Sequence, residues 1–327
     1  DGVLQRIKRG EPGALFMPGQ FGPNTPGAAG AIWRIDGKTG TVSLFATLPT
    51  NSGPGIGDIA YSKPLKQFYV SDLDNGLIYQ IDSTGRILGQ FDHGVNGRPG
   101  NGQQPVADDT RTMQITSPRF NALRPETWGY TQVQRRVSGM TVYNDRLYYA
   151  VSANAEVWSV GLQPDGSFAD DVRFEMTAAS ALKGKGPITS MQFDANGQLH
   201  LAQRGQQRAS YHYGDFVKPD ASAVVSYEKQ AAIAASPSTE LRQLRSRIPV
   251  GITSYRSSGG LAFGYGYGVD GTLKLDACSS TLWVTGDGLR SSQTTESDAG
   301  NGTQLFDVNG LQGLSAETSC VSTQTPI

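Results

Sequence analysis

One short pattern recurs along the chain and limits what it can fold into. It is an apolar–polar alternation around a bulky or aromatic residue, and alternation with a period of two predicts a β-strand with two unlike faces. The clearest copies are Ala31–Asp36 (AIWRID), Leu77–Asp82 (LIYQID) and Glu156–Val160 (EVWSV), with weaker copies at Ala223–Tyr227 and Gln304–Val308. A strand that returns five times indicates a repeat of one small sheet.

Each copy belongs to a longer unit. Two strand-like segments precede it, as in IGDIAYSKPLKQFYVSD, and short turns such as YNDR, DANG and VDG connect such segments. Asn, Asp and Gly tolerate the positive φ angles of tight hairpins. A further turn (DGKTG, DSTG or QPDG) and a fourth strand follow the copy, at 42–48, 87–91 and 172–176. The sequence therefore predicts an all-β fold, a β-propeller of four-stranded antiparallel blades with a period of about 45 residues.

The wording of the second unit resembles a known group of proteins. The stretch GIGDIAYSKPLKQFYVSDLDNGLIYQIDSTGRIL is similar to a blade of the NHL-repeat and gluconolactonase-like (senescence marker protein) β-propellers. The resemblance covers about two thirds of the chain and implies the architecture, with six blades usual in that group. Five aromatic strands are legible here, so five or six blades are expected and six is favoured. A β-sandwich with coincidental alternation is the alternative.

Composition supports this fold class and excludes some functions. The chain has 327 residues, 41 glycines, 17 prolines and only 17% charged residues, which is typical of short strands joined by turns. Its net charge of −1 indicates no general attraction to nucleic acid. No apolar run has the length needed to span a bilayer. We expect residues 1–327 to form one propeller domain, a mature or excised piece that could be one module of a longer exported protein.

The two cysteines, Cys278 and Cys320, flank the final unit. They are either a buried free pair or a disulfide, and their placement favours the disulfide. A bridge that closes a loop of about 40 residues would stabilise the fold by roughly 4 kcal/mol. A disulfide favours an exported protein, whether secreted, periplasmic or at the cell surface.

Long connections are expected at one face of the propeller. The connections between second and third strands, and between successive blades, open on the same face, and the extra sequence falls there: 19–30, 96–134, 204–222, 230–257 and 286–302. The 230–257 stretch contains a candidate short helix, STELRQLRSR. Loops on a rigid scaffold carry function preferentially. Sealing of the channel is the alternative role for these loops.

Candidate site residues follow from this placement. Polar residues at the starts of the connections between second and third strands should ring the channel mouth. Two of the long connections contribute aromatic residues. The ligand- or partner-binding set is Gln20, Asp72, Asn154, Arg204, Tyr211, His212, Tyr213, Asp287 and Trp128. Asp72, Asp74, Asn75 and Asp287 offer oxygen ligands of the kind that calcium takes. Turn formation is the alternative role for these aspartates, and packing over the channel is the alternative for the aromatic cluster.

These observations favour a non-catalytic exported propeller that binds a protein or glycan partner through its loop-rich face. The resemblance implies the alternative of a calcium-dependent hydrolase or lactonase. The first unit departs from that family, because it reads GALFMPG where the family places an acidic residue in a Glu-Gly-Pro motif. A structural module of a surface or filament-forming protein is a third hypothesis. The sequence shows no catalytic motif, so we lean toward a protein that is not an enzyme.

Overall fold

Five antiparallel sheets follow one another along the chain. The structure, a computed structural model, describes residues 29–49, 51–53, 55–114, 116–121, 124–178, 181–182, 186–194, 196–205, 221–229, 242–251, 253–264, 281–286, 289 and 310–315. Within these residues three sheets have four strands, one has three and one has two. No helix in this part of the chain has the length and apolar character needed to cross a membrane.

The three complete blades run in sequence order from the inner to the outer strand. They are β3 (Ile56–Ser62), β4 (Gln67–Asp72), β5 (Leu77–Ile81) and β6 (Ile87–Asp92); β7 (Val137–Tyr143), β8 (Arg146–Val151), β9 (Glu156–Leu162) and β10 (Phe168–Thr177); and β11 (Ile188–Phe193), β12 (Leu199–Gln203), β13 (Val224–Lys229) and β14 (Arg242–Ile248). The three-stranded sheet is β15 (Ser257–Gly264), β16 (Thr281–Gly286) and β17 (Gly310–Ser315), and the two-stranded sheet is β1 (Ala31–Ile35) and β2 (Val42–Thr47). Short helical turns are η2 (His93–Gly97), η3 (Arg98–Asn101), η4 (Pro125–Thr127) and η5 (Ala153–Ala155).

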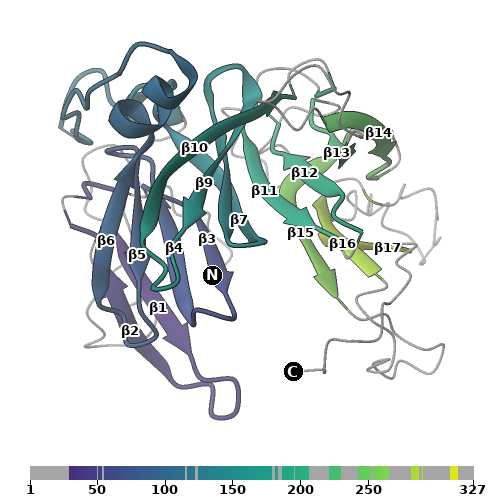
Figure 1. Cartoon of the computed structure of the whole chain (residues 1–327), viewed down its shortest axis with the longest axis horizontal. Coiled ribbons are helices and arrows are strands. Elements are labelled where there is room, and N and C mark those ends of the chain that lie inside the picture. The colour runs from purple at the N-terminus through teal and green to yellow at the C-terminus, as the bar shows by residue number, and fades with distance from the viewer. Residues whose placement is uncertain are drawn as a thin grey trace, which may run out of the picture.

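The sheets are arranged as propeller blades. Strands β3, β7, β11 and β15 are successive neighbours, so each sheet places its first strand beside that of the next. Figure 1 shows the sheets following one another in an arc from the purple to the yellow end of the chain. Hydrogen bonds join these inner strands: Asp58 Oδ2 accepts from the Met140 amide at 2.8 Å, and Ser138 Oγ donates to the Ile188 carbonyl at 2.6 Å. The predicted propeller of four-stranded blades is confirmed.

The hydrophobic core lies in layers between neighbouring blades. Adjacent residues on one strand point into different layers: Tyr149 packs with Trp158 toward the β3–β6 blade, whereas Tyr148 packs with Met191 toward the β11–β14 blade. This is the period-two alternation of a strand that is buried on both faces. A side chain as large as Trp158 is fully buried there, and burying an aromatic ring of this size contributes several kcal/mol of stability.

All four inner strands carry a pairing irregularity near their first residues. The register shifts between Ile56 and Ile59 in β3, and at equivalent places in β7, β11 and β15. A β-bulge of this kind leaves a residue out of the ladder and bends the strand. We call the end of the propeller at which the inner strands begin the mouth rim; it includes residues 51–53, 73–76, 93–136, 152–155 and 204–205. The other end is the opposite rim.

The structure corrects three expectations. Arg242–Ile248 is strand β14, so the candidate helix STELRQLRSR is wrong over these residues; pairing with β13 overrides the helical spacing of the leucines. The strand beside β16 is Gly310–Ser315 rather than Gln304–Val308, which lies outside the described residues. Long connections also join strand ends at the opposite rim, at 230–241 and 265–280, so the prediction of one plain face is wrong. Six blades remains a prediction, because the described strands form three complete blades and two partial sheets.

Candidate functional site

The β4–β5 turn at the mouth rim is organised by Asp72. Its Oδ1 accepts from the Asp74 amide at 2.9 Å and from Asn51 Nδ2 at 2.9 Å, and its Oδ2 accepts from Asn75 Nδ2 at 3.0 Å. Asn75 also donates to the Tyr79 hydroxyl at 3.0 Å. Asp72 is fully buried, and burial raises the pKa of its carboxyl to about 6 although the three donors favour the ionised form. In the structure Asp72, which was predicted at the channel mouth, therefore acts as a turn former.

Asp74 ties the same turn to the segment before β3. Its Oδ2 accepts from the Ser52 amide at 2.6 Å and the Ser52 hydroxyl at 2.7 Å. Its Oδ1 is buried and accepts no hydrogen bond within the described part of the chain. Buried carboxylate oxygens are normally paired. This oxygen is the one feature of the turn that the local hydrogen bonds do not explain.

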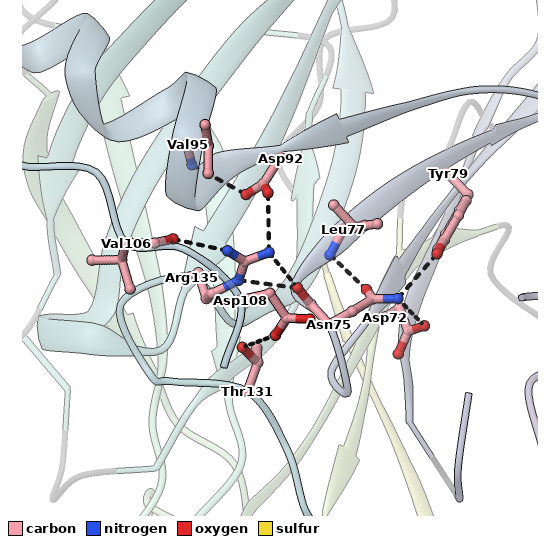
Figure 2. A network of polar contacts seen from close by, with 10 residues as sticks. All are labelled: Asp72, Asn75, Leu77, Tyr79, Asp92, Val95, Val106, Asp108, Thr131 and Arg135. Atoms are coloured by element: carbon pink, nitrogen blue, oxygen red, sulfur yellow. Dashed lines mark hydrogen bonds and ion pairs between the residues drawn. The ribbon is translucent and has the colours of Figure 1, made fainter. Parts of the chain in front are cut away.

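Arg135 fastens the long connection between β6 and β7 to this turn (Figure 2). Its side chain is 1% exposed. Its Nε and Nη2 donate to the Asn75 carbonyl at 3.0 and 2.6 Å, Nη1 donates to the Val106 carbonyl at 2.8 Å, and Nη2 also meets Asp92 Oδ2 at 3.0 Å. One buried guanidinium thus joins the turn, the end of β6 and the middle of the connection. Charge-assisted bonds of this kind are the strong ones in proteins.

Further contacts hold the 93–136 connection against the blades. The Thr131 amide donates to the Leu73 carbonyl at 2.9 Å, and Thr131 Oγ1 donates to Asp108 Oδ1 at 3.2 Å. The Met113 amide donates to Ser52 Oγ at 2.8 Å. The side chain of Met113 is buried, as is that of Phe120. The predicted loop is therefore a folded part of the mouth rim that buries two of its apolar side chains.

An aromatic and cationic group lies at the end of this connection. The rings of Trp128 and Tyr130 meet edge to face with centroids 6.0 Å apart, and the guanidinium of Arg136 lies 5.3 Å from the Tyr130 centroid. The Thr131 carbonyl accepts from Arg136 Nε at 3.1 Å and Nη2 at 2.5 Å and so fixes that guanidinium. Burial raises the pKa of the Tyr130 hydroxyl, and the charges of Asp74 and Asp72 add to this effect. A cation held over a ring is a favourable pair in a partly desolvated site.

The other predicted site residues divide into two groups. Asn154 is exposed in the β8–β9 turn with φ of 53°, and its carbonyl accepts from Thr177 Oγ1 at 2.8 Å. Arg204 is exposed at the end of β12. Gln20, Tyr211, His212, Tyr213, Asp287, Cys278 and Cys320 lie outside the described residues. The predicted binding set took only Trp128 from the long loop and left out Arg135 and Arg136, although arginines and aromatic residues together in this loop indicate an interface as readily as a solvated loop.

The described residues do not form a calcium site by themselves. Both oxygens of Asp72 already accept from N–H groups, which a bound cation would have to displace. Asp74 offers one open oxygen, and Asn75 uses its Oδ1 to accept from the Leu77 amide at 2.9 Å. No group of three His, Cys, Asp or Glu side chains is placed to hold a metal in this part of the chain.

Comparisons with known proteins find a weak likeness to several solved structures. No family model and no curated protein matches the chain. Among solved structures, the calcium-binding protein regucalcin from Agrobacterium tumefaciens is 15% identical, with a TM-score of 0.42 over 78% of this chain and 61% of its own. Virginiamycin B lyase from Staphylococcus aureus is 14% identical, with a TM-score of 0.36 over 78% of this chain and 55% of its own.

A protein from Lactobacillus plantarum is 13% identical, with a TM-score of 0.39 over 87% of this chain and 81% of its own. The chain thus spans less than two thirds of the length of the first two proteins. At such identities and TM-scores no activity or ligand is transferred to this chain. The propeller assignment rests on its own strand order and blade contacts.

Proposed function

We propose that this chain is a non-catalytic β-propeller that binds a protein or glycan partner through its mouth rim. The supporting observation is the folded 93–136 connection, which the buried Arg135 guanidinium joins to the β4–β5 turn and to the end of β6. This connection presents Trp128, Tyr130 and Arg136 at its end. Tryptophan, tyrosine and arginine are the residue types that dominate binding energy at interfaces. A preformed rim also reduces the entropy lost on binding.

A position-specific crosslink tests this proposal. A photoreactive phenylalanine analogue is placed at position 128 in one variant and at position 84, on the exposed β5–β6 turn of the opposite rim, in the control. After irradiation in extract of the source cells, we expect a crosslinked species at position 128 that excess unlabelled protein removes. Identical patterns at both positions, or none at position 128, would contradict the proposal.

We further propose that the protein is exported, on the basis of Cys278 and Cys320. A non-reducing peptide map should show these two cysteines joined in the protein isolated from its source. Free thiols at both positions would remove the support for export but would leave the proposed binding role unaffected.

A calcium-dependent hydrolase of the gluconolactonase-like kind is the second candidate. The observation that favours it is the buried Asp74 Oδ1, which has no donor among the described residues. Asp287, which lies outside those residues, would have to complete such a site. The thermal midpoint Tm should rise clearly in excess calcium relative to excess chelator, and Asp74→Asn should abolish the difference while Asp82→Asn, on the opposite rim, retains it. An unchanged Tm in wild type would eliminate this candidate.

A further inference from the structure

The 93–136 connection differs in charge from the rest of the chain. It contains six arginines, no lysine and three acidic residues, so its formal charge is +3, whereas the whole chain carries −1. The Arg135 guanidinium makes internal contacts, whereas Arg111, Arg119 and Arg124 are exposed. The acidic residues Asp108 and Asp109 are partly covered. The outer layer of this part of the rim is therefore cationic.

Two of these arginines lie close together near Tyr130. Arg136 is fixed over the Tyr130 ring. Asp109 Oδ2 pairs with Arg111 Nε at 2.7 Å and also accepts from Gln132 Nε2 at 3.4 Å. The Gln132 carbonyl in turn accepts from the Arg136 amide at 3.1 Å. Asp109 and Gln132 thus link Arg111 to the backbone of Arg136, and the charge of Arg111 adds to the burial that lowers the pKa of Arg136.

A third arginine comes from the next blade. The Arg204 amide donates at 3.0 Å to the carbonyl of Pro187, which directly precedes β11, and Arg136 directly precedes β7. Strands β7 and β11 are neighbours joined by the Ser138–Ile188 hydrogen bond. Arg136 and Arg204 therefore lie at the mouth ends of adjacent blades, and the charges of both lower the pKa of Tyr130, opposing the effect of its burial. The Arg204 side chain makes no ion pair within the described residues.

Asp109 pairs with Arg111 within this cluster, and the other two aspartates near Tyr130 lie in a deeper layer. Asp72 and Asp74 are buried, and three of their four oxygens accept hydrogen bonds from the turn and from Asn51 and Ser52. A ligand that approaches from solvent meets the guanidinium groups first. Arginine presents paired N–H donors that match a carboxylate bidentately.

We propose that Arg111, Arg136 and Arg204 bind the carboxylates of an acidic peptide segment from a partner protein. This inference rests on the proposed function and names the class of partner. Trp128 and Tyr130 supply apolar contact beside the cations. Val95 and Val133, 44% and 43% exposed, add apolar surface on the same connection. Aromatic, arginine and exposed aliphatic side chains together match the composition of protein interfaces.

The experiment measures binding of a fluorescein-labelled, twelve-residue glutamate-rich peptide by anisotropy, with a glutamine-substituted peptide of the same length as the control. We expect the glutamate peptide to bind, its affinity to fall as salt rises, and the glutamine peptide not to bind. Arg204→Gln should weaken binding about tenfold, since the variant loses a charge-assisted hydrogen bond to the peptide. Arg136→Gln should do the same, and Arg86→Gln, on the opposite rim, should leave binding unchanged.

Equal Tm values for Arg204→Gln and wild type establish that the variant is folded, because the Arg204 side chain has no described partner. No binding of the glutamate peptide, or equal affinity in Arg204→Gln and Arg86→Gln, would overturn the inference. An acidic oligosaccharide in the same assay tests whether the partner is a glycan instead. If it binds through these arginines and the peptide does not, the partner is a glycan, and the inference fails while the proposed function stands. The crosslink at position 128 tests that function separately.

Discussion

Aspartates organise turns at both rims of the propeller, but in opposite environments. At the opposite rim Asp36 and Asp82 are solvent-accessible, and each accepts from a threonine hydroxyl and from backbone amides of its own turn. These bonds lower the pKa of both carboxyls, that of Asp82 to about 2. At the β4–β5 turn of the mouth rim burial raises the pKa of Asp72 to about 6, as it does that of Asp58 on the inner strand β3. The same residue type thus marks a simple turn in one region and a desolvated charge in the other.

The difference comes from what covers each turn. The β4–β5 turn contacts the segment before β3 through Asn51 and Ser52, and Arg135 brings the 93–136 connection to the Asn75 carbonyl. No such polar contacts from other segments reach the Asp36 and Asp82 carboxylates among the described residues, although the Phe45 backbone lies close to Gly85 in the Asp82 turn. Buried polar groups depend on all their partners being present. The mouth rim should therefore be the more sensitive region to substitution and to pH.

The largest expected effect is at Arg135. Arg135→Met removes the guanidinium that bonds to the Asn75 carbonyl, to the Val106 carbonyl and to Asp92, and it leaves the Asp92 carboxylate without its cation. We expect the free energy of unfolding in urea to fall by about 3–5 kcal/mol, the usual loss when one partner of a buried ionic network is removed. Arg86→Gln on the opposite rim, 76% exposed, is the matched control and should leave the urea midpoint unchanged. Equal urea midpoints for the two variants would contradict the expected difference in sensitivity between the two rims.

His93 should give the mouth rim a second sensitivity, to acid. Its Nδ1 lies 3.0 Å from the Tyr149 hydroxyl, its ring packs edge to face on Trp158, and burial lowers its pKa to about 3, with the charges of Arg98 and Arg135 adding to the effect. The unfolded chain takes up this proton more readily, so stability is present above pH 6.5 and is lost as the pH falls below it.

The expected loss is up to about 3 kcal/mol between pH 6.5 and 4.5, at about 1.4 kcal/mol per pH unit. Urea titrations across this range should show a smaller loss in His93→Phe than in wild type. Parallel pH profiles for the two proteins would show that His93 does not carry this dependence.

Two glycines in equivalent turns of the opposite rim distinguish the effect of a neighbouring segment from the effect of the left-handed backbone. Gly85 has φ of +91°, and a Cβ there would lie 1.9 Å from the Phe45 carbonyl oxygen; Gly40 has φ of +68° and open space around it. Gly40→Ala should cost about 1 kcal/mol from the left-handed backbone alone. Gly85→Ala should cost about 2–3 kcal/mol, because strain and a backbone clash add. Equal losses in thermal unfolding would mean that the β1–β2 sheet does not press on this turn.

The most direct comparison of the two rims concerns the sign of their pH dependence. Because burial raises the folded pKa of Asp72 to about 6, its contribution to stability decreases as pH rises from about 4 to 6, by up to about 1.4 kcal/mol per pH unit, and we expect Asp72→Asn to remove this decrease. Because the folded pKa of Asp82 is lowered, its contribution is present above pH 3.8 and is lost as pH falls toward 2. Differences of the same sign in urea titrations of Asp72→Asn and Asp82→Asn would refute the comparison.

The strands were predictable because their signal is local. Alternation in a strand such as β8, where Tyr148 and Tyr149 face different blades, is written in consecutive residues. The error at β14 has the same origin, since the leucine spacing within 238–247 fits a helix and only pairing with β13 decides otherwise. Blade architecture follows from the repeat, whereas the lengths of individual connections are unconstrained by it.

The site was predictable only in outline. Asp72 was expected at the channel mouth, but its role depends on Asn51 and Tyr79, which lie on other segments. The bond from Arg135 to the Asn75 carbonyl spans 60 residues of sequence. Nothing local distinguishes Arg135, which is buried, from Arg136, which lies over a tyrosine ring. That assignment requires the path of the whole connection.

The irregular pairing at the start of each inner strand has a consequence for how such a protein can change. A one-residue insertion in a regular strand shifts its register and turns every following side chain to the wrong face. The extra residues in β3, β7, β11 and β15 interrupt the ladder just after the incoming segment arrives. New or longer segments can therefore be grafted ahead of these points while the layers between blades keep their partners, so recognition can diversify on a scaffold that does not have to be redesigned.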